Sequence, residues 1–370
     1  MIKRALPLVV ATLVVMPPSR RWFVAHGLLW LYLAATSCAL ALVAVPVVRA
    51  YARWRGILDH PAARKVHRIP TPLLGGAAVY AAFALTVLMN FTFSRELKGV
   101  ALGAALVVFV GIVDDLLDLP AWVKLLGQVA AAGVAIAFGA VLRVVPHDVA
   151  ASGALNLVVT AVWFLTVTNA VQFLDGMDGL ASGLGVVTGL FFSVVALQSG
   201  QPYLMFLSAS LVGACAGFLP YNFRPGGATI FLGDGGASFI GFTLAGLAVM
   251  GEWARNDPLV AMLTPTLILG VPLFDIAFVG VVRVVQGKVH SLHEWLAYTG
   301  KDHLHHRFES LGFTKTQTVF LIYFICGTLG ISAMLLNGAP AREAVLILVQ
   351  VACVLAIVAV LEGVGRGRSG

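Results

Sequence analysis

Carboxylate side chains gather where an apolar stretch of the chain ends, at Asp114, Asp115 and Asp118. Asp114 and Asp118, four residues apart, share one face of a helix, whereas the adjacent pair Asp114 and Asp115 does not. Carboxylates this close repel one another unless a cation lies among them, and such oxygen ligands suit Mg²⁺ or Mn²⁺ shared with phosphate groups. A solvated helix end explains an isolated Asp-Asp pair about as well. Lys124, on the next expected helix, is placed either to bind phosphate or to extend toward the membrane surface.

A second polar block interrupts another apolar stretch, with Asn169 and Gln172 followed by Asp175 and Asp178. Each of these two aspartates precedes a glycine, which allows positive φ angles and a close approach of the backbone to a ligand. A simple turn needs one Asp-Gly step rather than two with amides beside them. We therefore interpret the block as a binding site.

Asp234 lies in the glycine-rich segment 230–238, which opens an expected helix. Backbone N–H groups at a helix start attract anions, and a carboxylate there can hold a cation. An N-cap in an ordinary interfacial loop explains Asp234 but not the nearby Asn222 and Arg224. The segment therefore predicts a metal and phosphate site.

Basic side chains cluster in the longest polar loop, at His303, His305, His306 and Arg307. No cysteine or HExxH arrangement supports a zinc site. Histidines beside an arginine fit an anionic pocket for a nucleotide diphosphate better than they fit zinc, and a solvated basic loop is the alternative.

Two further features leave their roles open. Lys65 and His67 precede a segment rich in proline and glycine, and they either bind a lipid phosphate or anchor the loop to anionic headgroups. Asp275 lies inside an apolar span, where an acidic residue is a functional candidate by default. For Asp275 we favour structural pairing with a neighbouring helix.

The composition indicates the kind of scaffold that holds these groups. Of 370 residues, 59% are hydrophobic and 11% are charged, whereas a soluble domain carries about 25% charged residues. A water-soluble globule and a disordered chain are both excluded. The four cysteines lie in apolar stretches without CxxC spacing, so we expect no disulfide framework. The formal net charge of +7 follows the pattern of membrane proteins, and we expect no nucleic-acid partner.

Apolar stretches long enough to cross a bilayer recur along the chain. The expected spans are 23–49, 74–93, 99–113, 122–141, 156–173, 179–198, 202–219, 236–251, 258–282, 316–337 and 342–362. The sequence predicts an all-α integral membrane protein, a single polytopic domain over 1–370 with about 10–11 transmembrane helices. Its expected catalytic loops are about 50–73, 114–124, 169–183, 220–238 and 283–315. The role of the short apolar segment 5–16 stays open.

Lysine and arginine are unevenly divided between the two sides of this arrangement. The loops opposite the expected catalytic loops hold only Arg95, Lys98, Arg143, Arg255 and Arg342. The positive-inside rule therefore places the catalytic loops in the cytoplasm. We expect a multi-pass protein of the plasma (inner) membrane with its active site at the cytoplasmic surface.

The order and spacing of these motifs, from about Lys65 to Glu309, resemble the polyprenyl-phosphate N-acetylhexosamine-1-phosphate transferases of glycosyltransferase family 4. The lysine-histidine-proline segment, the Asp-Asp pair, the DGxDGLA block, the glycine-rich loop and the HxHH loop appear in family order. The resemblance implies transfer of a sugar-1-phosphate, GlcNAc-1-phosphate in the favoured version, from a UDP-N-acetylhexosamine to undecaprenyl or another polyprenyl phosphate. UMP is released, Mg²⁺ (or Mn²⁺) is the cofactor, and the product initiates a lipid-linked cell-envelope glycan.

The resemblance also implies roles for individual residues. Catalysis falls to Asp114 and Asp115, and metal binding to Asp234 and Gln172. The implied substrate-binding residues are Lys65, His67, Lys124, Asn169, Asp175, Asp178, Asn222, His303, His305, His306 and Arg307. Three departures from the family pattern stand out: Gln172 replaces the usual Asn, Ala237 replaces the usual Ser, and Leu292–Gly300 is longer than usual.

Three alternatives stay open. Within the family, the donor of the rival branch carries MurNAc-pentapeptide, although the HxHH form followed by Arg307 looks more like the GlcNAc branch. A membrane prenyltransferase also uses aspartate-rich Mg²⁺ motifs but needs no HxHH loop. A secondary transporter fits broken helices and Asp275, but its sites lie near the midplane of the membrane, whereas these acids cluster at one face. The oligomeric state also stays open, with a homodimer as one alternative.

Overall fold

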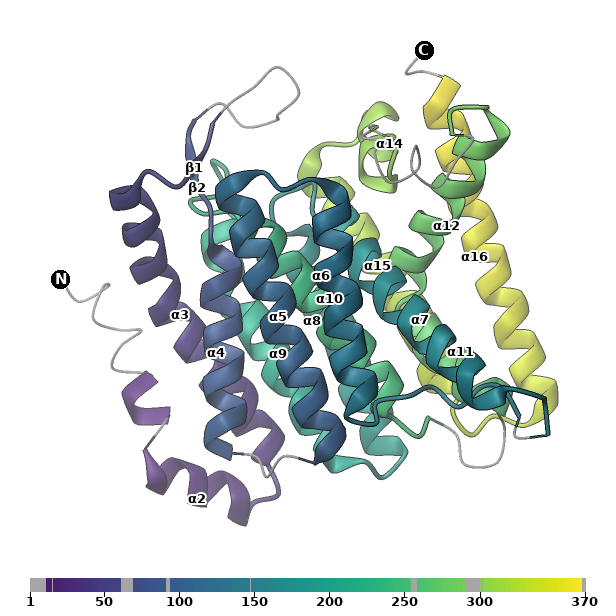
Figure 1. Cartoon of the computed structure of the whole chain (residues 1–370), viewed down its shortest axis with the longest axis horizontal. Helices are drawn as coiled ribbons and strands as arrows, with labels where there is room; N and C mark the ends of the chain where they lie inside the picture. Colours follow the sequence, from purple (N-terminus) through teal and green to yellow (C-terminus); the bar gives the residue numbers. More distant parts are fainter. Residues whose placement is uncertain are drawn as a thin grey trace.

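The computed structural model describes residues 11–14, 16–60, 69–90, 94–146, 148–253, 258–289, 300 and 302–367. This part of the chain is a bundle of helices, most of them running in one direction or its reverse (Figure 1). Its one sheet within those ranges is a hairpin of β1 (Leu58–Asp59) and β2 (Thr71–Pro72), antiparallel with Leu58 opposite Pro72. The all-α fold class expected from the sequence is confirmed.

The helices follow the apolar stretches of the sequence closely. They are α2 (Pro17–Ala25), α3 (Leu29–Arg55), α4 (Gly75–Asn90), α5 (Arg95–Leu117), α6 (Ala121–Ala137), α7 (Ser152–Leu174), α8 (Leu180–Gln198), α9 (Pro202–Asn222), α10 (Gly233–Met250), α11 (Pro258–Ile268), α12 (Gly270–Val285), α14 (Leu304–Ser310), α15 (Lys315–Leu336) and α16 (Ala341–Gly367). Local signals set several of the ends. Ser94 accepts a hydrogen bond from the backbone N of Leu97, and Thr314 forms a capping box with Gln317.

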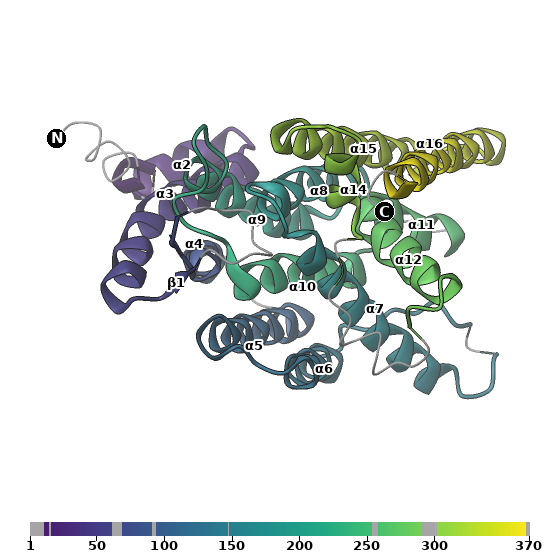
Figure 2. The same cartoon turned by 90° about the horizontal axis from the view of Figure 1, so that it is seen from above.

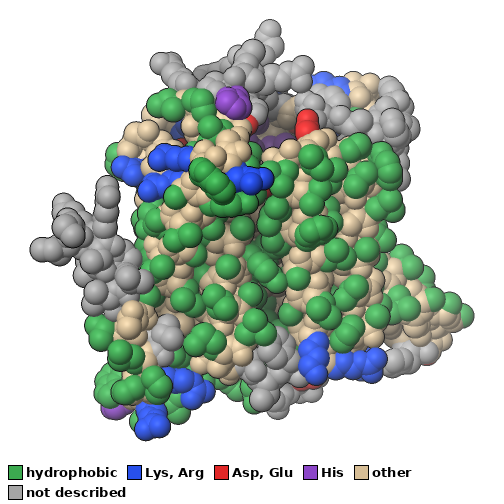
Figure 3. All heavy atoms as spheres, turned by 60° about the vertical axis from the view of Figure 1, so that its left-hand side comes forward, with side chains coloured by type: hydrophobic (Ala, Val, Ile, Leu, Met, Phe, Trp, Pro, Cys, Tyr) green, Lys and Arg blue, Asp and Glu red, His purple; other side chains and the backbone are tan. Residues whose placement is uncertain are grey.

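Eight helices in the described ranges are long and apolar enough to cross a membrane. The pair α11 and α12 together makes a ninth candidate, but the two helices are bent by 86° at their junction. Two shorter apolar helices, α4 and α6, run alongside them (Figure 1). Figure 3 shows the outer face of the bundle as a broad hydrophobic band with lysine and arginine side chains at both of its ends. The protein is therefore a multi-pass membrane protein.

Helix α10 lies at the centre of the bundle, with α5 and α6 on one side and α15 and α16 on the other (Figure 2). Most of its residues are buried, and it packs against α4, α5, α7, α8 and α9. A helix buried on every side must be apolar or small throughout. The sequence GDGGASFIGFTLAGLAVM meets that condition, and it places Asp234 in the first turn of the central helix.

Several expected boundaries were displaced, with consequences for the site. The span expected over 99–113 extends to Leu117, so Asp114 and Asp115 lie in the last turn of α5 rather than in a loop. The expected span 236–251 begins at Gly233, so the glycine-rich segment is partly helical. At the N-terminal side, residues 23–25 belong to α2, because Gly27, at φ 70°, separates α2 from α3.

Backbones come unusually close where α5 and α4 meet the start of α10. A Cβ atom added at Gly111 would lie 2.3 Å from the Cα of Gly235, and one at Gly76 would lie 2.2 Å from the Cα of Gly236. The backbone N of Gly76 also donates to the carbonyl oxygen of Leu232 at 2.7 Å. These glycines therefore hold the first turn of α10 against its neighbours.

We expect Gly111→Ala to destabilise the protein, because its new methyl group meets backbone atoms that cannot move independently. The expected loss is about 1–3 kcal/mol, as for other overpacked sites, and thermal unfolding in detergent measures it. Gly133→Ala on α6 is the matched control, since nothing lies within 4 Å of a Cβ there. Equal melting temperatures for the two variants would contradict this packing argument.

Candidate active site

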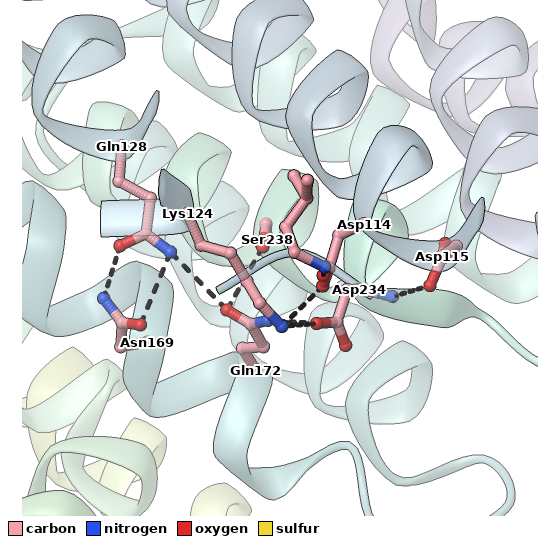
Figure 4. A network of polar contacts seen from close by, with 9 residues as sticks. Asp114, Asp115, Lys124, Gln128, Asn169, Gln172, Asp234 and Ser238 are labelled. Carbon is pink, nitrogen blue, oxygen red and sulfur yellow. Dashed lines mark hydrogen bonds and ion pairs between the residues drawn. The ribbon is translucent and has the colours of Figure 1, made fainter. Parts of the chain in front are cut away.

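Four helix ends meet at the upper end of the bundle in Figure 1, and their side chains form one polar network (Figure 4). The ammonium of Lys124, in the first turn of α6, lies 2.6 Å from Asp114 Oδ2 and 3.1 Å from Asp234 Oδ2. Asp114 is 6% exposed, so its carboxylate depends on Lys124 and on the backbone N of Leu119, which donates to its Oδ1 at 2.8 Å. One lysine therefore bridges two carboxylates from helices 120 residues apart in the chain.

Asp115 faces the same region from the other side of α5. Its Oδ1 accepts a hydrogen bond of 2.9 Å from the backbone N of Asp234, at the start of α10. Its Oδ2 is buried and has no hydrogen-bond partner in the part of the chain that the structure describes. Gly233, at φ 76°, leaves just enough space for the Asp115 carboxylate, because a Cβ at this position would meet that same oxygen. An acceptor left unsatisfied inside a structure is a candidate for a ligand or an ion.

Amide side chains extend the network away from the acids (Figure 4). Gln172, in the last turn of α7, donates from Nε2 to Asp234 Oδ2 at 2.8 Å, and its Oε1 accepts from Ser238 Oγ at 3.3 Å. Asn169 donates from Nδ2 to Gln128 Oε1 at 2.6 Å. The network surrounds a small open pocket lined by Gly111, Asp114, Lys124, Gln128, Gln172, Asp234 and Ser238 together with Val107 and Val110.

The segment between α7 and α8 carries both Asp-Gly steps of the second motif. Loss of water around the half-buried carboxyl of Asp175 raises its pKa well above the usual value, and the nearby charges of Asp234, Asp115 and Asp178 add to this. Asp178 instead accepts from the backbone N of Ala228 at 2.9 Å. The network thus concentrates negative charge that a cation would relieve.

Asn222 connects loops rather than facing the pocket. Its Oδ1 accepts from the backbone N of Gly179 at 2.6 Å, and its Nδ2 donates to the carbonyl oxygen of Ile230 at 3.1 Å. The expected role of Asn222 is substrate binding, whereas these contacts indicate that it positions the loop that contains Asp175 and Asp178.

The histidines and the arginine at positions 303–307 form the histidine segment. Helix α12 fixes the start of this segment through two buried pairs of side chains, Arg283 with Asp302 and Asp275 with His303. Arg283 donates to both carboxylate oxygens of Asp302, from Nε at 2.8 Å and from Nη2 at 2.7 Å. These hydrogen bonds and the positive charge of Arg283 outweigh burial and lower the pKa of Asp302. Asp275 lies 2.7 Å from His303 Nδ1 and accepts from the backbone N of Leu304 at 2.7 Å. The expected structural pairing of Asp275 is present, with a partner in a loop rather than in a neighbouring helix.

His305 and Arg307, by contrast, are buried with polar atoms that have no hydrogen-bond partner among the described residues. His305 is 2% exposed, and neither ring nitrogen is satisfied; for Arg307 the unsatisfied atom is Nε. Burial, with the nearby His306 and His303, lowers the pKa of His305 well below its usual value, which keeps the ring neutral. A Cβ at Gly176 would meet the His305 ring. The structure therefore brings this histidine against the first Asp-Gly step, as a shared binding site requires.

The structure does not bring every expected residue to the pocket. Lys65 and His67 lie outside the described residues. Asp118 is exposed and ends α5 in a left-handed conformation at φ 51°, so the expected shared face with Asp114 is wrong. His306 is 3.6 Å from Glu309 on the same short helix. Gln128 and Ser238 line the pocket without having been assigned a role, although each lies four residues after a site residue, Lys124 and Asp234.

The residues present fit Mg²⁺ in the mode that shares the ion with phosphate groups. No cluster of three His, Cys, Asp or Glu side chains in the described ranges forms a closed metal cage. Mg²⁺ usually needs less, since one or two carboxylates with water and substrate phosphates suffice. Asp234, the free oxygen of Asp115 and the Gln172 amide oxygen supply hard donors, and excess negative charge surrounds them. The fold and this polar site at one end of the bundle define a multi-pass membrane protein with an acid–lysine centre suited to phosphate chemistry.

Comparisons with known proteins identify the family. The model of glycosyl transferase family 4 matches residues 97–252. A "Probable undecaprenyl-phosphate N-acetylglucosaminyl 1-phosphate transferase" of Bacillus subtilis is 31% identical over 332 residues, covering 88% of this chain and 90% of the relative. A "Decaprenyl-phosphate N-acetylglucosaminephosphotransferase" of Mycolicibacterium smegmatis is 31% identical over 80% of each chain. A "Phospho-N-acetylmuramoyl-pentapeptide-transferase" of Symbiobacterium thermophilum is 32% identical over 316 residues, 79% of this chain and 90% of that relative. The chain belongs to glycosyl transferase family 4, and it is a transferase.

We expect a charge exchange to test the pair that α12 forms with the histidine segment. Arg283→Asp or Asp302→Arg alone leaves two like charges in a buried place, at a cost on the order of 3–5 kcal/mol. The double variant restores opposite charges and should recover part of the lost melting temperature. Arg342→Asp, at an exposed arginine, is the control. A double variant as unstable as the sum of the two single variants would contradict the pairing.

Proposed function

We propose that the protein transfers N-acetylglucosamine-1-phosphate from UDP-N-acetylglucosamine to a polyprenyl phosphate, releasing UMP and using Mg²⁺. The observation that carries the proposal is the contact of Lys124 with Asp114 and Asp234 beside Asp115, because it gathers both signs of charge for phosphate chemistry at one end of an apolar bundle. The names of the relatives support the transferred N-acetylglucosamine-1-phosphate group and the polyprenyl phosphate acceptor.

The proposed reaction joins a soluble anion to a lipid with a charged head. An oxygen of the polyprenyl phosphate attacks the phosphorus that bears the sugar, and a new P–O bond forms. The bond from that phosphorus to the bridging oxygen breaks, and UMP leaves with that oxygen. A phosphate monoester with a second pKa of about 6 is mostly dianionic at neutral pH, so it needs little help from a base. Asp114 and Asp115 then serve mainly to position the reacting groups.

Lys124 is the residue best placed to balance the charge of the transferred phosphate. Without substrate its ammonium contacts two carboxylates, and a quarter or more of its side chain remains exposed to the pocket opening. A fixed positive charge close to a developing negative charge is worth several kcal/mol in a protected site. The N–H groups of the first turn of α10 add a positive helix end to the same place.

Asp234, Gln172 and Asp115 are the residues we assign to Mg²⁺. The bound ion would neutralise phosphate charge and orient the diphosphate. In this proposal Gln172 turns its amide oxygen, which now accepts from Ser238, toward the ion. Gln128 and Asn169 hold Gln172 in place through the chain of amide contacts.

We assign the nucleotide sugar to the side of the pocket formed by the Asp-Gly steps and α14. His305 and Arg307 carry the unsatisfied nitrogen atoms there, and Asp175 and Asp178 lie on the facing loop. His303 is already held by Asp275, so we propose that it positions its neighbours. Lys65, His67 and His306 remain predictions for substrate binding, and so does a homodimer.

The active site faces the cytoplasm of the plasma membrane in this proposal. The hairpin β1–β2, the site and α14 all lie at one end of the bundle (Figure 1). The described arginines at the end of α3 and in the loop before α10 lie there too, in agreement with the positive-inside rule. UDP-sugars are soluble anions, so an opening on that side gives them access.

The reaction is tested by UMP release from purified protein with undecaprenyl phosphate and, separately, UDP-GlcNAc, UDP-GalNAc or UDP-MurNAc-pentapeptide. We expect release with UDP-GlcNAc that requires the carrier lipid and is lost with EDTA. Lys124→Gln should lower the rate roughly 10²-fold or more, as loss of a preorganised charge contact does. Release only with the pentapeptide donor would move the chain to the other branch of the family. No release with any donor, in folded protein, would overturn the proposal.

Binding of Mg²⁺ is tested without turnover. We expect Mg²⁺ to raise the melting temperature of the purified protein, because a ligand that binds only the folded state stabilises it. Asp234→Asn should abolish the rise, whereas Asp118→Asn, at the exposed aspartate after α5, should retain it. The same rise in both variants would show that the ion binds elsewhere.

A further inference from the structure

Four arginines lie at or beside the end of α3, away from the pocket, and three of them, Arg49, Arg53 and Arg224, form a cluster. Arg49, Arg53 and Arg55 belong to the last two turns of α3, and Arg224 comes from the loop between α9 and α10. Arg49 and Arg53 are four residues apart and share one face of the helix. The charges of Arg53 and Arg224 both act on Arg49, so two separate segments bring like charges together here. None of the four lines the pocket.

The arrangement is held in place by an aromatic contact. The guanidinium carbon of Arg49 lies 5.9 Å from the ring centroid of Tyr221, in the last turn of α9. The hydroxyl of Tyr221 donates to the carbonyl oxygen of Leu42 at 2.9 Å, which fixes the ring against α3. Arg49 is half-buried, whereas Arg53, Arg55 and Arg224 are exposed. The cluster is therefore a surface in which Arg49 is held in place by Tyr221 and the other arginines are exposed.

No ion pair in the described part of the chain joins these arginines to a carboxylate. The ion pairs of that part involve other residues, and the segment 61–68, which is not described, contains no Asp or Glu. The C-terminal end of α3 offers a partial charge of only about −0.5, far less than the charge of the three guanidinium groups. Arginines brought together without an acid form a site for an anion with several oxygens.

The same helix end also faces lipid. The exposed fractions are 65% for Val47, 49% for Tyr51 and 76% for Trp54. Exposed Tyr and Trp side chains are typical of the boundary between hydrocarbon and headgroups. Figure 3 shows basic side chains at the upper end of this face, directly above the hydrophobic band. Helix α3 packs mainly on α9 and α4, whereas the pocket lies among α5, α6, α7 and α10. An anion held here thus lies at headgroup depth and remote from Lys124.

We propose that this cluster of Arg49, Arg53 and Arg224 binds the phosphodiester headgroup of an anionic phospholipid from the surrounding bilayer. Its position on the outer rim matches a lipid that stays in the membrane and takes no part in the transfer. Near a membrane surface, each basic residue strengthens attraction to anionic lipid by roughly 5-fold.

Native mass spectrometry of the delipidated full-length protein tests this, with phosphatidylglycerol and phosphatidylcholine of the same chains added in turn. We expect the wild-type protein to bind phosphatidylglycerol more tightly than phosphatidylcholine. The triple variant Arg49→Gln, Arg53→Gln, Arg224→Gln should weaken that binding by on the order of 100-fold. The matched control is Arg21→Gln, Arg143→Gln, Arg342→Gln, which removes three exposed arginines at the other end of the bundle and should retain the tight binding.

The melting temperatures of both triple variants show whether each protein is folded. A second variant, with Arg→Lys at the same three positions, keeps the charges and should bind phosphatidylglycerol within a few-fold of the wild-type affinity. Equal weakening in the two Gln triples, or none in the first, would overturn the proposal. Tight binding of undecaprenyl phosphate alone, with phosphatidylglycerol and phosphatidylcholine bound equally, would also overturn it, because the cluster would then be a site for the carrier lipid.

Discussion

Mutual repulsion of carboxylates is the constraint around which this structure is arranged. Asp114 and Asp115 end one helix, Asp234 begins another, and Asp175 lies close enough for its pKa to respond to two of them. At the edge of a membrane, where water is scarce, such charges stay together only with cations among them. Lys124 supplies one positive charge directly. The unsatisfied oxygen of Asp115 and the charge that remains are the physical reason to assign a divalent ion to the same place.

The close approach of the helix backbones of α5 and α10 places these carboxylates together. A Cβ atom at Gly111 would lie 2.3 Å from the Cα of Gly235, so the first turn of α10 lies directly against the end of α5. On the other side, α12 leaves α11 at 86° and reaches the histidine segment through Asp275 and Arg283. The two halves of the site are thus held in different ways. Close packing at glycines holds the acids in place, and buried ion pairs hold the histidines. Within the described residues, the second half contains buried nitrogen atoms without a hydrogen-bond partner, those of His305 and Arg307.

The sequence predicted the fold class and the family well, because both depend on local pattern, and the structure brings the expected site residues Asp114, Lys124 and Asp234 together. Apolar length shows the spans, and the motifs are contiguous. It failed where the outcome depends on how an element ends or on which element lies opposite. The face shared by Asp114 and Asp118 assumed a helix that continues, yet Pro120 follows and Asp118 becomes a left-handed cap. The partner of Asp275 is His303, 28 residues further on, and no periodicity reveals such a pair. Gln128 and Ser238 were within reach, since each follows a site residue by one helical turn.

A structure determined with Mn²⁺ and UDP would test the central claim most directly, through the anomalous scattering of the metal. The account predicts one anomalous peak within ligand distance of Asp234, beside Asp115 and Gln172, with the diphosphate extending from it toward His305 and Arg307. A peak among the histidines of α14 instead, or a diphosphate bound without any metal near Asp234, would contradict the account.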